Sequence, residues 1–391
     1  LLYQTVSACR SEVMEAVAGP VEASAARILR RIAGPRMGSL KLGDSFEVAA
    51  VVPSGLDEAV SAEELSGGEK EQVHLAVRLA LADLLAKFRR SGPRPVDLVT
   101  TLSLPLQQAA VRALGSDRGA VVVLDPRTGD VLALASTPTY DASAVANPAT
   151  ADAAFARLRD DPGRALLPRS TLGRYTPGSV FKIVTAIAGF GAGVLDREST
   201  FPELPSAVRT GLPVDGFRIR EHPGVPARAL DFGAATEVSS NVYYALVGLR
   251  LGGDRLAAWA ARLGFGAPLP FELPTAVSQV TGGSGPDGGF RDAVELASAA
   301  YGQGETLVTP LQMALVAACV ANGGRLVAPR LVLERVTAEG RRIASPAREL
   351  GRVLSSADAA TITEAMIRAV NGPLGRSFTR GAQVPGVTVA G

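Results

Sequence analysis

The stretch GRYTPGSVFKIVTA, at positions 173–186, contains a lysine three residues after a serine. Its Lys182 is one of only four lysines in the chain. From residue 88 onward, all the remaining Lys or Arg positions are arginine. Ser179 lies three residues before Lys182, a spacing that places both side chains on one face of a helix. We infer that position 182 requires a property that lysine has and arginine lacks.

That property is the ability to give up a proton. A serine hydroxyl becomes an effective nucleophile when a base removes its proton. A lysine serves as this base where burial lowers its pKa, whereas arginine stays charged in proteins. Pro177 and Gly178 predict a helix that starts at Ser179, where the macrodipole favours a developing negative charge. Taken alone, Ser-x-x-Lys is weak evidence, because ordinary helices contain it by chance.

A second motif, Ser239-Ser240-Asn241, lies in EVSSNVYYA, sixty residues after Ser179. A Ser-x-Asn motif can supply a hydroxyl to a proton relay and an amide to hold a substrate carbonyl or amide. Serine and asparagine are also common in turns and helix caps. The motif gains its meaning from its order and distance relative to Ser179.

The surrounding segments indicate the fold class. RGAVVVLDPRTGDVLALAS, from Arg118 to Ser136, is typical of a β-hairpin with proline and glycine in its turn. SLPLQQAAVRALG predicts a helix that ends at Gly115, and GGDRLAAWAARLGFG and TPLQMALVAACVANGG predict two more helices downstream. A hairpin followed by many helices indicates an α+β architecture with helices against an antiparallel sheet.

With these motifs in this order, residues 99–391 resemble the transpeptidase domain of penicillin-binding proteins, most closely the class B kind. The stretches VTTLSLPLQQAA and YGQGETLVTPLQMALVAACVANGG contribute to the resemblance. It implies a penicillin-binding, serine β-lactamase-like fold, with helices on both faces of an antiparallel sheet. It also implies that Ser179 is the acylated nucleophile and Lys182 its general base. Ser239 would be the proton-relay hydroxyl, and Asn241 would bind the substrate amide.

The activity implied by the resemblance is a serine acyl-transferase, a D,D-transpeptidase that cross-links peptidoglycan stem peptides and binds penicillin. The implied partners are the stem peptide, β-lactams and a glycosyltransferase, on the extracytoplasmic side of the bacterial cell membrane. No metal or cofactor is expected for this chemistry. The net charge of +2 gives no reason to expect nucleic acid as a partner of this domain.

The family pattern is not fully present. The third motif of the family, Lys-Thr-Gly, normally follows a short strand similar to VAG, and this chain ends in PGVTVAG. We therefore expect a fold that is incomplete at its C-terminus and lacks the lysine for the substrate carboxylate. In the family, the strand that carries this motif also supplies one backbone N–H of the oxyanion hole, and losing such a donor costs on the order of 10²–10³ in rate. A catalytically dead module that only binds stem peptides therefore stays open as an alternative.

Residues 1–88 have a different pattern. ELSGGEKEQVHLAVRLALADLLAK predicts a long amphipathic helix with Ser66 as N-cap and Glu69 completing a capping box. This segment resembles the C-terminal head lobe of SMC-like, ABC-type DNA-repair ATPases. The resemblance implies that Ser66, Gly67 and Gly68 contact ATP held by another subunit, although a capped surface helix is the simpler alternative. Without a G-x-x-x-x-G-K-[ST] loop, this segment alone is not expected to hydrolyse ATP.

The composition of RRSGPRP predicts a linker over 89–98, between a partial α/β ATPase lobe at 1–88 and the transpeptidase domain at 99–391. A partial DNA-repair ATPase is thus the second function hypothesis. The two halves belong to different compartments, so we expect a joined or incomplete reading frame. Because the chain begins with leucine, an N-terminal membrane anchor is expected to be absent from it.

The cysteines and histidines suggest no further site. Cys9 and Cys319 lie far apart in the sequence, so no disulfide framework is expected. Cys319 lies in the apolar run LQMALVAACVA, which predicts a buried and inert thiol. His222 precedes Pro223 and Gly224 and is expected at the surface.

Overall fold

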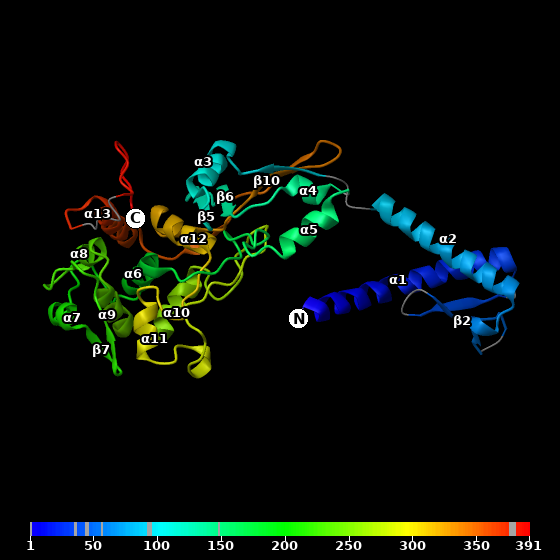
Figure 1. Ribbon diagram of the computed structural model, residues 1–391, viewed down its shortest axis with the longest axis horizontal. Helices are drawn as coiled ribbons and strands as arrows, with labels where there is room; N and C mark the ends of the chain where they lie inside the picture. Colours follow the sequence, from blue (N-terminus) through cyan, green and yellow to red (C-terminus); the bar gives the residue numbers. More distant parts are fainter. Residues whose placement is uncertain are drawn as a thin grey trace. The chain divides into compact units, whose positions relative to one another are not determined.

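The chain divides into two compact units, Leu1–Val96 and Asp97–Gly391. The computed structural model (Figure 1) describes residues 2–34, 37–43, 47–55, 58–91, 96–147, 149–374 and 381–391. The predicted linker over 89–98 overlaps the end of a helix and the start of a strand, and its residues 92–95 lie outside the described ones. Within these ranges, no helix has the length and apolar character needed to cross a membrane.

The N-terminal unit consists of two helices and a small antiparallel sheet. Helix α1 packs against helix α2, and the three strands are ordered β1-β2-β3. The core contains Val21, Ala25 and Leu29 from α1 and Val73 from α2. The elements are α1 (Leu2–Ala33), β1 (Ser39–Leu42), β2 (Val48–Val52), β3 (Val60–Ser61), the 3-10 turn η1 (Ala62–Glu64) and α2 (Gly67–Ser91).

Helix α2 begins with the capping box that the sequence predicted. The backbone N–H and the hydroxyl of Ser66 donate to the Glu69 carboxylate at 2.9 and 2.6 Å, and the Glu69 N–H donates to Ser66 Oγ at 3.4 Å. The hydrogen bond from the Ser66 hydroxyl, followed by that from its N–H, lowers the pKa of Glu69. An ionised carboxylate therefore occupies the N-terminus of α2.

The C-terminal unit is α+β, as predicted. Its helices are α3 (Leu104–Leu114), α4 (Ala142–Ala146), α5 (Ala151–Arg159), α6 (Lys182–Gly191), α7 (Leu204–Thr210), α8 (Phe232–Glu237), α9 (Asn241–Leu251), α10 (Gly253–Arg262), α11 (Ala293–Ala299), α12 (Pro310–Ala321) and α13 (Ser356–Asn371), with 3-10 turns η2 (Gly178–Phe181) and η3 (Pro286–Gly288). Its strands are β4 (Asp97–Thr100), β5 (Gly119–Leu124), β6 (Val131–Thr137), β7 (Leu212–Val214), β8 (Phe217–Ile219), β9 (Arg325–Val327), β10 (Val332–Val336), β11 (Arg342–Ala344) and β12 (Glu349–Arg352).

The predicted hairpin forms between β5 and β6, and helices cover both of its faces (Figure 1). Because side chains alternate along a strand, Val121 and Val123 pack with Ala110 of α3 on one face. Val122 and Leu124 pack against the main core on the other face, and β5 contacts α12. This arrangement confirms the helices predicted on both faces.

In the described residues, the antiparallel sheet that we expected is divided into small sheets, of which the β5-β6 hairpin is one. The other described strands of this unit make separate small sheets, with the orders β11-β10-β4, β12-β9 and β7-β8. Two of these strand pairs, β7-β8 and β10-β11, are joined by short turns. Asp215 and Gly216 both have positive φ between β7 and β8, and Gly340 has φ +78° between β10 and β11.

The main core surrounds α6 and α9. Residues 182–189 of α6 and 242–248 of α9 are all buried, and α6 packs against α9. Cys319 is buried in α12, which confirms the burial predicted for its thiol, and burial raises the pKa of the thiol to about 11. His222 is exposed, as predicted.

Candidate active site

Ser179 lies in the 3-10 turn η2, and α6 begins only at Lys182, so the helix predicted from Ser179 starts later than expected. Gly178 has φ +58°, a conformation that glycine adopts without steric cost, and its N–H donates to Gly302 O at 2.8 Å. Phe181, at the end of the turn, is fully buried and packs edge to face against a second phenylalanine. The turn is therefore anchored on both sides, while Ser179 itself is exposed.

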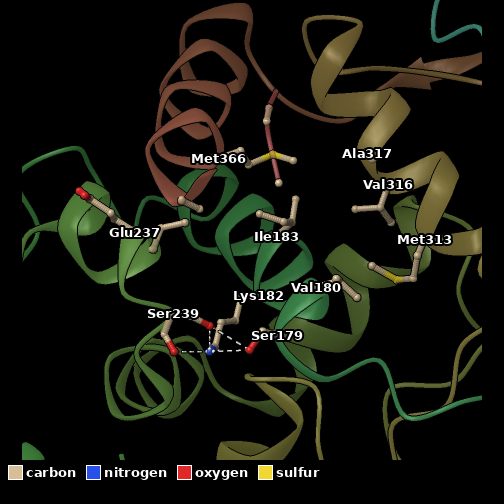
Figure 2. Close-up of a pocket in the computed structure, with 14 residues that line it drawn as sticks. Ser179, Val180, Lys182, Ile183, Glu237, Ser239, Met313, Val316, Ala317 and Met366 are labelled. Atoms are coloured by element: carbon tan, nitrogen blue, oxygen red, sulfur yellow. Dashed lines mark hydrogen bonds between the residues drawn. The ribbon is translucent and has the colours of Figure 1, made fainter. Parts of the chain in front are cut away.

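Lys182 lies at the centre of the site and is only 3% exposed (Figure 2). Its Nζ is 3.1 Å from Ser179 Oγ, 2.9 Å from Ser239 Oγ, 2.7 Å from the Ser239 backbone oxygen and 2.9 Å from Asn241 Oδ1. The Ser239 hydroxyl lies 2.9 Å from Ser179 Oγ. The structure thus brings together the four residues predicted for this half of the chain.

The groups around Nζ define what the amine can do. The Ser239 carbonyl and Asn241 Oδ1 have no proton to give, so both accept hydrogen bonds from Nζ. A neutral amine has two N–H groups for these two acceptors, and its lone pair is left to accept a hydroxyl proton. An ammonium instead has a third N–H, which it donates to a serine hydroxyl oxygen, that of Ser179 or Ser239. The site therefore accommodates both the neutral and the protonated form of Lys182.

The Ser-x-Asn motif lies at the start of α9, and its residues have different surroundings. Ser239 has φ +56°, in the left-handed region that serine seldom adopts, and its carbonyl faces Lys182. Ser240 is the N-cap of α9, because its Oγ accepts the Tyr243 N–H at 3.1 Å. Both sequence interpretations thus apply: the middle serine caps a helix, and the outer two residues contact the lysine.

A cavity of about 400 Å³ opens beside these residues (Figure 2). Ser179, Lys182 and Ser239 lie at one end of it. Its apolar wall is formed by side chains from three helices, among them Ile183 of α6, Val316 of α12 and Met366 of α13. A polar, reactive end therefore adjoins an apolar wall.

Comparison with known proteins places this site in a family. A family model described as "Penicillin binding protein transpeptidase domain" matches residues 119–391. The chain belongs to this family. The C-terminal unit, called the transpeptidase domain from here on, contains the whole of the match.

Two similar curated proteins are named as peptidoglycan D,D-transpeptidases. The chain is 35% identical over 313 residues to peptidoglycan D,D-transpeptidase PbpA of Mycolicibacterium smegmatis, covering 77% of this chain and 62% of that protein. It is 31% identical over 245 residues to peptidoglycan D,D-transpeptidase MrdA of Escherichia coli K12, covering 61% of this chain and 37% of that protein. The chain thus spans less than two thirds of the length of these relatives.

Solved structures confirm the mixed α+β transpeptidase fold. The imipenem acyl-enzyme complex of penicillin-binding protein A from M. tuberculosis matches with a TM-score of 0.67 and 29% identity, over 86% of this chain and 76% of that one. The penicillin G acyl-enzyme complex of the same protein matches with a TM-score of 0.65 and 27% identity, over 88% of this chain and 80% of that one. These comparisons support neither the ATPase resemblance of residues 1–88 nor the expected incompleteness of the fold. Ser66, Gly67 and Gly68 belong to the N-terminal unit and are not part of this site.

Sequence reasoning missed Glu221, which lies in the loop after β8 of the transpeptidase domain. Its carboxylate accepts hydrogen bonds from Ser240 Oγ at 2.5 Å, Asn241 N at 2.8 Å and Val242 N at 3.2 Å. Glu221 is 20 residues away from Asn241 and belongs to no recognisable motif. No local pattern in the sequence could have predicted this contact.

A buried ion pair lies on the other side of the motif. Glu237 is two residues before Ser239, and its side chain is fully buried. Arg368 of α13 donates to Glu237 Oε2 from Nε at 3.0 Å and from Nη2 at 2.8 Å, and the Leu374 N–H donates to Oε1 at 2.6 Å. The pair therefore links the end of α8 to the end of α13.

An aromatic ring lies near the lysine. The Tyr244 ring centroid is 5.8 Å from Lys182 Nζ. Burial raises the pKa of Tyr244, and its hydroxyl shares a hydrogen bond of 2.7 Å with Thr236 Oγ1. The phenol therefore stays neutral beside the amine.

Proposed function

We propose that the transpeptidase domain is a serine-type D,D-transpeptidase that cross-links peptidoglycan stem peptides through an acyl-enzyme at Ser179. The observation that carries this proposal is the position of Lys182 Nζ, which is buried 3.1 Å from Ser179 Oγ while two pure acceptors hold its N–H groups. Membership of the penicillin-binding family and relatives named as D,D-transpeptidases give independent support.

In the proposed mechanism, Ser179 Oγ attacks the carbonyl carbon of a D-Ala-D-Ala bond while Lys182 Nζ takes the hydroxyl proton. The Ser239 hydroxyl, 2.9 Å from both Ser179 Oγ and Lys182 Nζ, gives its proton to the D-alanine nitrogen as the peptide C–N bond breaks. It regains a proton from the Lys182 ammonium, which returns the lysine to its neutral form.

The amine nitrogen of a second stem peptide then attacks the acyl carbonyl carbon, and the ester bond to Ser179 breaks as the new amide bond forms. Lys182 takes the proton that the amine loses and returns it to Ser179 Oγ. β-Lactams react at the same serine by opening of their ring.

Asn241 also has a role in substrate binding. Its Oδ1 accepts from Lys182, and its Nδ2 makes no hydrogen bond within the described residues. An amide nitrogen in this position can donate to a carbonyl of the stem peptide. We therefore assign Asn241 to both the lysine and the substrate amide.

The test is acylation of the chain by penicillin G, followed by intact-mass and peptide-mass measurement. The expected result is one penicilloyl adduct on Ser179, which Ser179→Ala abolishes. No adduct after prolonged incubation of the folded chain would contradict the proposal. Saturable penicillin binding without an adduct would favour a module that only binds stem peptides.

The proposal extends to location and partner. A peptidoglycan substrate places the domain on the extracytoplasmic side of the bacterial cell membrane, and a glycosyltransferase that makes the glycan strands is the partner that the reaction requires. The proposed function does not include ATP binding by Ser66, Gly67 and Gly68. The Ser66 hydroxyl donates to Glu69, and the ionised carboxylate lies at the helix N-terminus where a phosphate would bind.

A further inference from the structure

The start of α9 is held by a carboxylate from a distant loop. Glu221 accepts hydrogen bonds from the Ser240 hydroxyl and from the first two N–H groups of α9, those of Asn241 and Val242. It also accepts the N–H of His222 at 3.1 Å. A negative charge at a helix N-terminus is stabilising, so this contact favours the observed start of α9.

This contact fixes residues that the proposed reaction uses. Asn241 and Ser239 flank Ser240, which is fully buried and contacts both Glu221 and the Tyr243 N–H. Ser239 has φ +56°, and such a conformation persists only where its surroundings determine it. Without the carboxylate, the turn has less to hold the Ser239 carbonyl and Asn241 Oδ1 against Lys182.

We propose that Glu221 is a positioning residue for acyl transfer, which acts through Ser240 and the first turn of α9 to keep Ser239 and Asn241 in contact with Lys182. This inference rests on the proposed function. It also gives a reason for serine in the middle of the Ser-x-Asn motif. The hydroxyl of Ser240 caps α9 and donates to Glu221 at the same time.

The first variant is Glu221→Gln, which keeps the size of the side chain. Both carboxylate oxygens of Glu221 face N–H donors, Asn241 N at Oε1 and Val242 N at Oε2. Either orientation of an amide therefore points its NH₂ at a donor. Because a misplacement of about 1 Å costs on the order of 100-fold in rate, we expect acylation by penicillin G to slow by about 10- to 100-fold.

Glu272→Gln is the matched control. The Glu272 carboxylate likewise accepts two consecutive backbone N–H groups, Leu331 N at Oε2 and Val332 N at Oε1, both at 3.0 Å. It belongs to no part of the site. We expect its acylation rate within about twofold of the wild type, and the Tm of both variants checks that each is folded. A purely structural role of Glu221 would instead give both variants similar acylation rates.

A double-mutant cycle tests the route through Ser240. If Glu221 acts through this hydroxyl, the Ser240→Ala/Glu221→Gln protein acylates about as fast as the slower single variant. Effects that multiply would contradict this route. If Glu221→Gln does not fold, Ser240→Ala alone provides the test, and a wild-type acylation rate in that variant overturns the proposal.

Hydrogen exchange separates this proposal from the proposed function. We expect the amides of residues 238–244 to exchange faster in Glu221→Gln than in Glu272→Gln. If the wild-type chain forms no acyl-enzyme, the proposed function fails, and exchange alone then decides whether Glu221 holds the turn. Unchanged exchange, or an acylation rate in Glu221→Gln equal to that of the control, overturns the proposal.

Discussion

Replacement of Arg368 by methionine leaves the Glu237 carboxylate, which is 0% exposed, without its counter-ion. Removing one partner of a buried ion pair costs about 3–5 kcal/mol. Arg368 is 38% exposed, which places the expected loss in the free energy of unfolding near the lower end, at about 3 kcal/mol. For a domain of this size, that corresponds to a fall in Tm of about 6 °C.

The control for this prediction is an ion pair whose acidic partner, Glu364, lies one helical turn before Arg368 on α13. Arg197 pairs with Glu364, and both side chains are more than half exposed, at 54% and 53%. Exposed pairs contribute about 0–1 kcal/mol, so Arg197→Met should lower Tm by no more than about 2 °C. Thermal unfolding followed by circular dichroism measures both variants. Equal Tm values for Arg368→Met and Arg197→Met would refute the reasoning from burial.

Three further predictions concern the turn before the nucleophile, a buried carboxylate and the thiol. Gly302→Ala places a methyl group against the Gly178 carbonyl, so it should slow acylation and destabilise the fold by more than about 1 kcal/mol, whereas Gly193→Ala, with φ +68° and open space around it, should leave acylation unchanged in the same assays. Burial alone would raise the pKa of Glu295, but hydrogen bonds from Thr281 and from the N–H groups of Arg291 and Gly282 outweigh it and lower the pKa. The folded state therefore binds fewer protons, so stability falls as pH drops below about 4.3, and denaturant titrations should show less of this acid sensitivity in Glu295→Gln. In a Cys9→Ser background, Cys319 should react with Ellman's reagent only as fast as the domain unfolds, and rapid reaction of the native protein would contradict its burial.

Features governed by neighbours in the sequence could be predicted from it. The pairing of Ser179 with Lys182 follows from a spacing of one helical turn, and the hairpin follows from two apolar runs around a Pro-Gly turn. The capping box of Ser66 and Glu69 is equally local. These predictions hold because the interactions that determine them lie within a few residues.

Features governed by distant contacts could not be predicted. The 3-10 turn at Ser179 depends on the bond from Gly178 to Gly302, which comes from a distant part of the sequence. Glu221 reaches the Ser-x-Asn motif from a loop with no recognisable pattern. Strand pairing across the domain likewise depends on long-range register, which hydrophobic alternation does not reveal.

In the proposed mechanism, Lys182 must be able to lose its charge so that Ser179 can attack. Lys182→Arg keeps a positive side chain but places a group there that does not give up its proton. The direct measurement is the rate of penicilloyl adduct formation on Ser179 in this variant, with its Tm as a check of folding. We predict a folded protein that forms no adduct, and a folded Lys182→Arg protein that acylates at the wild-type rate would contradict the account.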